Sequence, residues 1–412
     1  MIIKYNSTYQ NLTSKTFKVF ALLMLLLLYE CVDPYEGSIG TYEDVLVVNC
    51  IVTNQNKHHE VSLTHSYRFE DDGPKAERNA HISITTDDGE EFLFEETQPG
   101  KYRSVQPFAA QMNKDYRLMI TTSNGKSYAS KNMQLPVSST KIDMVYAKRM
   151  VNGDGNDGMG IFVESFDPTG QSKYYRHAYE ETYKIVAPNW SPYDVYLIGE
   201  GEQQDYFSVI LREREERTCY GTNSVNPIIL KSTVGLNEDR LKDYNIRFID
   251  RNNYILSYRY SILVKQYVQS PEAFSYYETL KGLSQTSDNI FSEDQPGFLA
   301  GNVFSLDDPN EHVVGFFEVA TEDEKRIFFN YEDFFPGEEL PPYVVGCITL
   351  APYDKGRIGE RPLGKILKEG NVRFYGFNTN PAPFEGPYIL TSPECGDCTT
   401  LGSNLVPDFW IE

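Results

Sequence analysis

Short apolar stretches at even spacing, separated by turn residues, constrain the fold of this chain more than any other feature. Val45–Val48 forms the first stretch, and apolar and polar side chains alternate over residues 80–84. Asp87-Asp88-Gly89 and Ser123-Asn124-Gly125 suit tight hairpin turns, because these residue types tolerate a positive φ. Residues 44–140 are therefore predicted to form an N-terminal β-sandwich of the immunoglobulin-like or prealbumin-like kind.

The rest of the chain, residues 141–412, is predicted to form a larger β-rich domain. A strand is expected over residues 254–264, and the 30 Tyr and 24 Phe of the chain favour pleated, half-buried surfaces. One short helix is expected, with Ser270 as its cap, Pro271 at its first position and Gly282 at its end. The predicted fold class is therefore mainly β.

A basic and then apolar segment lies near the start of the sequence. Lys15 and Lys18 precede the apolar run Val19–Leu28, and Cys31 follows shortly after it. This order is that of a secretory signal peptide. The run is shorter than the roughly 20 apolar residues of a membrane-spanning helix, so no transmembrane helix is expected in the mature protein.

The cysteine after the hydrophobic run resembles that of a lipoprotein signal, in which it becomes the acylated first residue. Residues 1–30 are then the signal peptide, Cys31 carries the lipid, and residues 31–43 form a polar tether. Tyr29 and Glu30 stand where such signals carry small residues. The alternative is that the leader is cleaved elsewhere or retained as an anchor, with the cysteine an ordinary thiol.

The charge of the chain argues against two classes of partner. Lys and Arg number 38 against 59 Asp and Glu, which gives a formal net charge of -21. A nucleic-acid backbone or a bare anionic lipid surface would repel such a protein. The acidity is interpreted as a contribution to the solubility of an exported protein.

The 6 cysteines fall into three groups. Cys31 is the lipid site, and Cys50, within the first apolar strand, is expected to be a small buried residue. The others are expected to form two disulfides, because exported thiols oxidise. They are Cys219, Cys347, Cys395 and Cys398. Three pairings are possible, and the sequence does not choose among them.

Two patterns suggest a redox or metal site, and a structural role explains each of them better. Cys395-Gly396-Asp397-Cys398 has the spacing of a thioredoxin-like centre or of half a zinc site, but neither a βαβ context nor a second close ligand pair accompanies it. Val151–Gly158 carries oxygen side chains, yet its Gly158 and the later Glu164 fall one residue late for a calcium-binding EF-hand loop. A glycine-rich hairpin turn is favoured, and no bound metal is expected.

No catalytic residue and no cofactor is expected. The sequence lacks a Gly-x-Ser-x-Gly elbow, a phosphate-binding glycine loop and a His-Glu-x-x-His motif. His58, His59 and His65 lie near the turn-forming residues 54–57 and are interpreted as solvated side chains at a loop tip. Trp190 is the best candidate for an exposed aromatic that binds a ligand, with core filling as the alternative.

Short motifs along the chain occur in a particular order. They are Cys31–Tyr35, Leu46–Val48, Asp87–Gly89, Gly100–Tyr102, Tyr116–Ile120, Gly125–Tyr128, Phe166–Pro168, Tyr174–Tyr175, Tyr260–Tyr267, Gln295–Pro296, Gly301–Val303, Val314–Phe317, Cys395–Cys398 and Pro407–Trp410. In this order the chain resembles the Bacteroidetes-type outer-membrane lipoproteins of the domain of unknown function 4249 family, over nearly the whole mature length. Cys50 departs from the family pattern, which commonly has glycine there.

The resemblance implies an accessory lipoprotein encoded beside a TonB-dependent outer-membrane transporter, without catalytic residues to carry over. The chain is accordingly interpreted as a non-catalytic protein, lipid-anchored to the outer membrane on its periplasmic or cell-surface face, that binds a nutrient transporter. Its ligand is unknown. Two alternatives remain at this stage: a surface adhesion or protein-interaction module, and an unrecognised hydrolase in the C-terminal domain.

Overall fold

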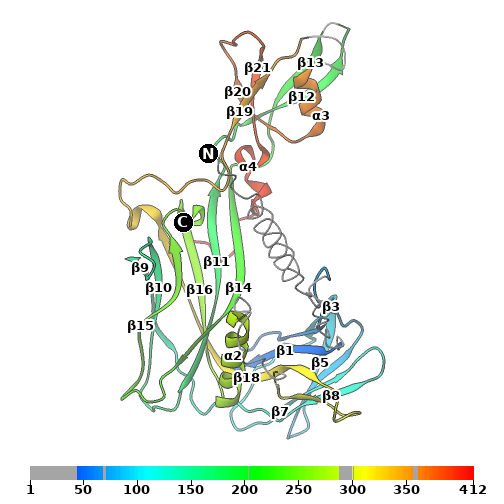
Figure 1. Ribbon diagram of the computed structural model, residues 1–412, viewed down its shortest axis with the longest axis vertical. Helices are drawn as coiled ribbons and strands as arrows, with labels where there is room; N and C mark the ends of the chain where they lie inside the picture. The colour runs from blue at the N-terminus through cyan, green and yellow to red at the C-terminus, as the bar shows by residue number, and fades with distance from the viewer. Residues whose placement is uncertain (1–43, 68–70, 203, 287–298, 300, 356–360) are drawn as a thin grey trace, which may run out of the picture.

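The computed structural model describes residues 44–67, 71–202, 204–286, 299, 301–355 and 361–412. The predicted signal peptide, Cys31 and the predicted tether lie outside these residues. The prediction of a mainly β fold is confirmed, since strands account for most of the regular structure. They form a lower sandwich, an upright sandwich and a small tip at the far end of the molecule (Figure 1).

The lower sandwich contains the first strands of the chain. They are β1 (Leu46–Thr53), β2 (Glu60–His65), β3 (Lys75–Ala76), β4 (His81–Thr86), β5 (Glu91–Gln98), β6 (Lys101–Ser104), β7 (Tyr116–Thr121) and β8 (Ser127–Ser130). The turns predicted at Asp87–Gly89 and Ser123–Gly125 join β4 to β5 and β7 to β8, so both hairpins are confirmed. Leu63, Ile82 and Leu118 are fully buried inside this sandwich.

The upright sandwich packs two sheets face to face. One sheet holds β15 (Asp239–Asp250), β10 (Asp157–Asp167) and β9 (Ile142–Val151), and the other holds β14 (Thr218–Ser232), β11 (Tyr174–Val186), β16 (Arg259–Val268) and part of β18 (Val313–Asn330). Ile161, Val163, Ile262 and Val264 are buried in the shared core. Removal of such side chains from water is the main favourable contribution to folding.

The expectation of a strand over residues 254–264 is wrong at its start. Tyr254–Leu256 forms a 3-10 helix, η1, and β16 begins only at Arg259. The side chain of Asn253 accepts a hydrogen bond from the Ile255 backbone N–H at 3.2 Å. This side-chain cap stabilises a turn, so the apolar run bends before it enters the sheet.

Strand β18 belongs to both sandwiches. Its first half, Val313–Ala320, pairs in parallel with β1, and its second half, Thr321–Asn330, pairs antiparallel with β16. At about 3.3 Å per residue, its 18 residues span roughly 60 Å. The preceding β17 (Val303–Ser305) pairs with β8. Residues 44–140 therefore share their sheet with residues from the middle of the predicted second domain.

A buried ion pair lies where β18 passes from one sandwich to the other. Glu318 is fully buried, and Arg176 Nη2 lies 3.1 Å from its Oε2. Gln269 Nε2 donates to the other carboxylate oxygen at 2.5 Å. The rings of Tyr267 and Tyr277 lie against the guanidinium, with centroids 4.4 and 4.7 Å from its central carbon. The two charges are thus compensated by each other and by their neighbours.

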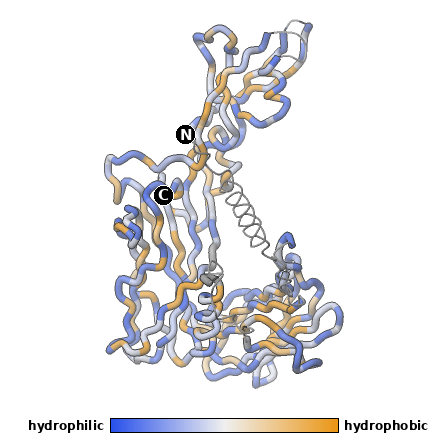
Figure 2. The backbone as a smooth tube through the Cα atoms, viewed as in Figure 1, coloured by the Kyte–Doolittle hydropathy of each residue, from blue (hydrophilic) through white to orange (hydrophobic). Residues whose placement is uncertain are grey.

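The tip is built from two separate segments of the chain. Its elements are β12 (Tyr193–Glu200), β13 (Asp205–Leu211), β19 (Thr349–Pro352), α3 (Pro362–Glu369), β20 (Arg373–Phe377) and β21 (Glu385–Thr391). β12 pairs with β13, and β21 lies between β19 and β20. Apolar residues continue along the strands of the tip, as they do in both sandwiches (Figure 2).

The expected helix is present, and it is one of three α-helices in the described residues. Helix α2 (Pro271–Thr286) begins at the predicted residue, but α3 and the one-turn α4 (Pro393–Gly396) are additional. In α3, Leu363, Ile366 and Leu367 share one face. A helix this short takes its stability from packing rather than from its own sequence, which is why local signals did not single it out.

The interpretation of His59 as a solvated side chain is also wrong. His59 precedes β2, is 2% exposed, and packs edge-on against Phe108, whose carbonyl oxygen lies 2.9 Å from Nε2. His177 in β11 is fully buried too, with Nε2 3.2 Å from Gln266 Oε1. Burial lowers the pKa of each imidazole to about 4, so both rings are neutral at pH 7.

We expect the free energy of unfolding to decrease as the pH falls from about 6.5 to about 4, because the unfolded histidines take up protons that the folded ones exclude. The contribution is fully present above the unfolded pKa and is lost as the pH approaches the folded value. It amounts to roughly 3 kcal/mol for each histidine. Urea unfolding across this range measures it, and His177→Gln should flatten the profile. An unchanged slope in that variant would contradict the assignment.

Candidate functional site

The tip has a small core of its own, which covers the inner face of the β12–β13 pair. The buried members are Val195, Leu363, Phe374 and Leu390, with Phe207 and Val209 packed against them. These residues come from both sheets of the tip and from α3. One side of the two-stranded pair is therefore removed from water.

The opposite side of β12 and β13 is apolar but uncovered, and is here called the outer face. It carries Tyr196, Ile198, Tyr206 and Ile210, which are 48%, 67%, 53% and 49% exposed. Because successive side chains of a strand point to opposite sides, these four point away from the core that Val195 enters. Exposed apolar surface gathered in this way marks interaction sites on soluble domains.

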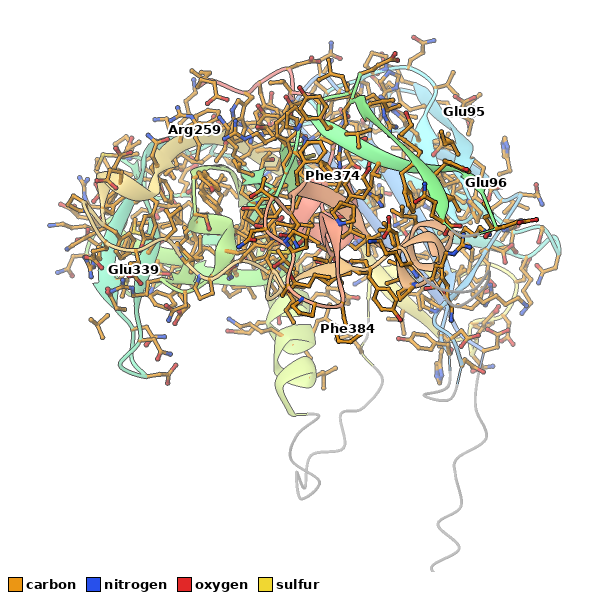
Figure 3. The ribbon with its side chains drawn as sticks, turned by 90° about the horizontal axis from the view of Figure 1, so that it is seen from above. Glu95, Glu96, Arg259, Glu339, Phe374 and Phe384 are labelled. Carbon is orange, nitrogen blue, oxygen red and sulfur yellow. A yellow bond between two sulfur atoms is a disulfide. The ribbon has the colours of Figure 1, made fainter. Side chains whose placement is uncertain are left out.

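Phe384 is a second exposed apolar residue of the tip, in the turn before β21. It is 86% exposed and has a φ of 73°, a conformation that costs a bulky residue roughly 1–2 kcal/mol. The Glu385 carboxylate holds the turn by accepting hydrogen bonds from Asn378 Nδ2 and Ala382 N, both at 3.1 Å. Seen from above, Phe384 lies at the margin of the molecule, apart from the buried Phe374 (Figure 3).

A buried ion pair holds α3 against the β12–β13 pair. Arg361 Nη1 lies 2.5 Å from Asp205 Oδ1, and the two side chains are 2% and 4% exposed. The same guanidinium donates to the carbonyl oxygens of Gly201 and Glu202, each at 2.9 Å. Gly364 permits this approach, because a Cβ there would lie 2.4 Å from Asp205 Oδ2. The two strands that carry the outer face are therefore held in place by α3 on their opposite side.

The tip joins the upright sandwich through a cross-linked neck, residues 187–192, 212–219 and 392–400. The two expected disulfides are confirmed, and the pairs are Cys219–Cys398 and Cys347–Cys395. Cys398, in η3 (Cys398–Thr400), is thereby tied to β14 of the upright sandwich. Cys395, in α4, is tied to the segment before β19. Two cysteines close together in sequence thus fasten the tip on one side and the body on the other.

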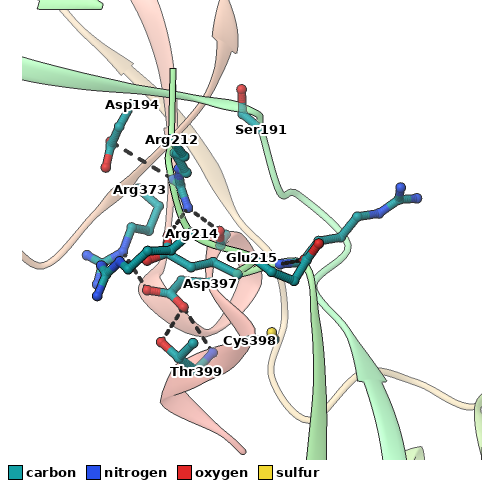
Figure 4. Close-up of polar contacts among 12 residues, drawn as sticks. Ser191, Asp194, Arg212, Arg214, Glu215, Arg373, Asp397, Cys398 and Thr399 are labelled. Atoms are coloured by element: carbon teal, nitrogen blue, oxygen red, sulfur yellow. Dashed lines mark hydrogen bonds and ion pairs between the residues drawn. The ribbon is translucent and has the colours of Figure 1, made fainter. Parts of the chain in front are cut away.

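Charged side chains reinforce the neck (Figure 4). Arg212 Nη1 donates to the Glu216 carboxylate at 2.7 Å. Asp397 accepts hydrogen bonds from Thr399 N at 2.9 Å and from Arg373 Nε at 3.2 Å. Burial opposes ionisation of Asp397, but these hydrogen bonds outweigh it and lower the pKa of the carboxyl. The neck is consequently held by polar contacts as well as by sulfur.

Trp190, the aromatic candidate for ligand binding, lies in the neck. It is half-buried and packs against the core of the upright sandwich, with the Arg217 guanidinium 5.9 Å from its ring centroid. Its indole N–H is buried without an acceptor in the described part of the chain. The structure gives this residue a packing position, apart from the outer face.

The C-terminal residues dock on the upright sandwich. The buried ring of Trp410 lies 4.9 Å from that of Tyr220 and 5.7 Å from that of Phe328, measured between centroids. The Arg326 guanidinium lies 3.5 Å from the ring centroid of Phe409. The terminal aromatic pair therefore anchors the tail, as expected of a chain end that would otherwise fray.

The glycine-rich segment Val151–Gly158 contains the hairpin turn between β9 and β10, which confirms its structural interpretation. Asn152 Oδ1 accepts hydrogen bonds from Asp154 N at 3.0 Å and Asn156 N at 2.9 Å, so its oxygen is used within the turn. Among residues 44–412 as far as they are described, no group of three or more His, Cys, Asp or Glu is placed to hold a metal ion.

The other two histidines of the predicted loop tip are engaged as well. His58 Nδ1 lies 2.7 Å from the Ser104 carbonyl oxygen, and His65 bridges the carboxylates of Asp44 and Glu77 at 2.8 and 2.9 Å. Their interpretation as solvated is therefore corrected too.

The described helices all fall short of the length and apolar content that a membrane crossing requires.

The outer face escaped recognition in the sequence for a physical reason. Val195–Ile198 is a run with little polar alternation, which is typical of a strand buried on both sides. Only its pairing with β13 in a sheet of two strands leaves one side of the run uncovered. The sequence signal for the outer face is thus an apolar run that has too few neighbouring strands to bury both of its sides.

Peptide mapping without reduction is expected to recover both disulfides, with fragmentation between Cys395 and Cys398 assigning the pairs. Cys50 should react with a thiol reagent only after unfolding, because its thiol is buried and burial raises its pKa. Replacing Cys219 and Cys398 together by Ala should lower the free energy of unfolding by roughly 2–5 kcal/mol. A different pairing, or four free thiols, would contradict the described neck.

The chain was compared with known proteins and protein families. No curated protein matches its sequence. One family model matches residues 32–326, more than half of the 412 residues, and covers β1 to β17, including β12 and β13 of the tip, and most of β18. The chain belongs to the family described as Domain of unknown function (DUF4249).

Proposed function

We propose that this chain is a non-catalytic lipoprotein of the outer membrane that acts by binding, as an accessory partner of a TonB-dependent nutrient transporter. The observation that carries the proposal is the outer face of the tip, where four apolar side chains are about half exposed or more. That face is backed by a buried ion pair and fastened to the body by disulfides. It is the docking surface in this proposal.

The composition of the outer face suits a protein partner. Tyr is enriched at protein interfaces, and Tyr196 and Tyr206 each offer an apolar ring with a hydroxyl that can form a hydrogen bond. Removal of apolar surface from water contributes about 25 cal/mol for each Å². A face that is already ordered loses little conformational entropy when a partner covers it.

Asp44, the first described residue, and the outer face belong to opposite ends of the molecule. Asp44 leads into β1 at the end that is remote from the upright sandwich, since Leu46 pairs with Val313 at the start of β18. The tip extends from the opposite end of the upright sandwich (Figure 1). A lipid on Cys31 would hold the chain by its lower sandwich and leave the tip accessible to a protein.

The charge of the chain also favours a protein over lipid as the binding surface. With a formal net charge of -21, the body would be repelled by an anionic membrane surface. An acylated cysteine needs no such attraction, because acyl chains contribute about 0.8 kcal/mol for each buried CH₂ group. Anchoring and recognition are therefore assigned to different parts of the chain.

Affinity purification from the native outer membrane, followed by mass spectrometry, tests the docking surface. We expect a TonB-dependent transporter to be recovered with the wild-type protein. Tyr196→Asp with Ile198→Asp should reduce that recovery at least about tenfold, because charged side chains at an interface core must be desolvated. The matched control is Val234→Asp with Leu236→Asp, which changes two residues 58% and 51% exposed in the turn between β14 and β15.

The control variant should recover the transporter as the wild type does. Equal recovery by the tip variant would show that the outer face is not the docking surface. Recovery of no transporter, or of an unrelated partner, would contradict the accessory role itself.

Metabolic labelling with palmitate tests the anchor. The wild-type protein should incorporate label and fractionate with the outer membrane, and Cys31→Ser should lose both properties. Cys50→Ser is the matched control, because Cys50 is buried in β1 and should not affect labelling. Unchanged labelling in Cys31→Ser, or no labelling of the wild type, would contradict lipid anchoring at this residue.

A further inference from the structure

A polar cavity lies where the lower and upright sandwiches meet, far from the tip. Its volume is about 370 Å³, within the usual range of small-molecule sites. The walls come from β1, β2 and β6 of the lower sandwich, from the loop between β1 and β2, and from β16 of the upright sandwich. It exists because β18 carries the two sandwiches side by side at this point.

Three lysines line this cavity in a protein of strongly negative charge. Lys57 forms an ion pair with Glu322, and Lys101 Nζ donates to Ser62 Oγ at 2.9 Å. The ammonium group of Lys265 has neither a hydrogen bond nor an ion pair among the described residues. Glu60 is the one carboxylate in the lining that the structure describes. The cavity thus offers cationic groups whose charge is only partly compensated.

His59 provides a second and independent feature of the lining. Its Nε2 faces the Phe108 carbonyl oxygen at 2.9 Å, so the neutral ring must carry its proton on Nε2 and donate there. Nδ1 is then an acceptor. It is buried and, in the described structure, no donor reaches it. Because buried polar atoms normally have partners, an unpaired acceptor on a residue of the cavity lining points to a missing donor.

These two features together define a ligand chemistry. Lysine ammonium groups favour a carboxylate or a phosphate, and they supply only donors. A neutral imidazole nitrogen requires a donor, such as a hydroxyl group. Sulfate would satisfy only the first requirement, and a neutral sugar only the second.

We propose that this cavity binds a small anion that also carries hydroxyl groups, such as a sugar acid. Lys265 and Lys101 contact its acidic group, and His59 Nδ1 accepts a hydrogen bond from one of its hydroxyls. Lys57, held by Glu322, is the third lysine of the lining. The site is independent of the proposed docking surface and stands if the transporter partnership fails.

Isothermal titration calorimetry of the full mature chain tests the proposal with three probes. Glucuronate carries both chemical features, glucose carries only hydroxyls, and succinate carries only carboxylates. Glucuronate should bind at least about tenfold more tightly than either of the others. Lys265→Gln should weaken glucuronate binding about tenfold, because it removes the uncompensated charge.

Lys242→Gln is the matched control, since Lys242 is an exposed lysine on β15 remote from the cavity lining. It should leave glucuronate binding unchanged. In the imidazole ¹⁵N spectrum, glucuronate should shift Nδ1 of His59 and leave that of His177 unmoved.

Each of the other outcomes would overturn the proposal. If succinate bound as tightly as glucuronate, the site would recognise charge alone. If glucose bound as tightly as glucuronate, the lysines would have no role in recognition. No detectable heat with glucuronate, or an unaltered affinity in Lys265→Gln, would show that the cavity does not recognise this class of ligand.

Discussion

The fold depends on one carboxylate, Glu318, buried at the point where β18 leaves the lower sandwich and enters the upright one. An ionised side chain at this depth is tolerated only with close compensation. Arg176 reaches it from β11 and Gln269 from the residue after β16, so these two strands of the upright sandwich are fixed relative to β18. The rings of Tyr267 and Tyr277 enclose the arginine. The contact therefore sets how one sandwich stands on the other.

The shared strand has consequences at both of its ends. Near the junction it brings the loop after β1 against the upright sandwich, where Glu322 N donates to Asn54 Oδ1 at 2.7 Å. That contact fixes the loop that contributes Lys57 to the lining of the lysine-lined cavity. Farther along, β18 extends the upright sandwich toward the neck. The cavity and the tip are thus positioned by the same element, although they are assigned different partners.

The tip is stabilised by different means. Its core has few buried residues, and so small a core contributes little on its own. Within the tip, the buried Arg361–Asp205 ion pair and the Cys347–Cys395 disulfide add to the stability that the small core provides. The Cys219–Cys398 disulfide fastens the neck. These constraints let the outer face remain apolar and uncovered without collapsing onto the body.

Sequence patterns predicted what depends on nearby residues. The two hairpins, the start of α2, the buried Cys50 and the set of four bridging cysteines all follow from local residue types or from the chemistry of exported thiols. The pairing of the cysteines did not follow, because spacing alone leaves all pairings open.

What the sequence did not predict depends on contacts over long distances. Asn54 and Glu322 are 268 residues apart, and no local pattern indicates that β1 will pair in parallel with β18. His59 has the sequence neighbours of a loop residue, but it is buried against Phe108, which lies 49 residues later in the chain. The outer face is uncovered because β12 and β13 form a sheet of only two strands. An apolar run in the sequence does not reveal how many strands its sheet will have.

Hydrogen exchange in a Glu318→Ala variant tests the central role of the junction most directly. The change leaves Arg176 buried without its partner, at a cost of roughly 3–5 kcal/mol. Exchange should accelerate together in β1 and β16, the two neighbours of β18, while β12 and β13 keep their protection. The control variant Glu238→Ala, at an exposed ion pair, should leave the exchange of all four strands unchanged. Acceleration confined to one sandwich, or none at all, would contradict the account in which strand β18 and its buried ion pair hold the two sandwiches together.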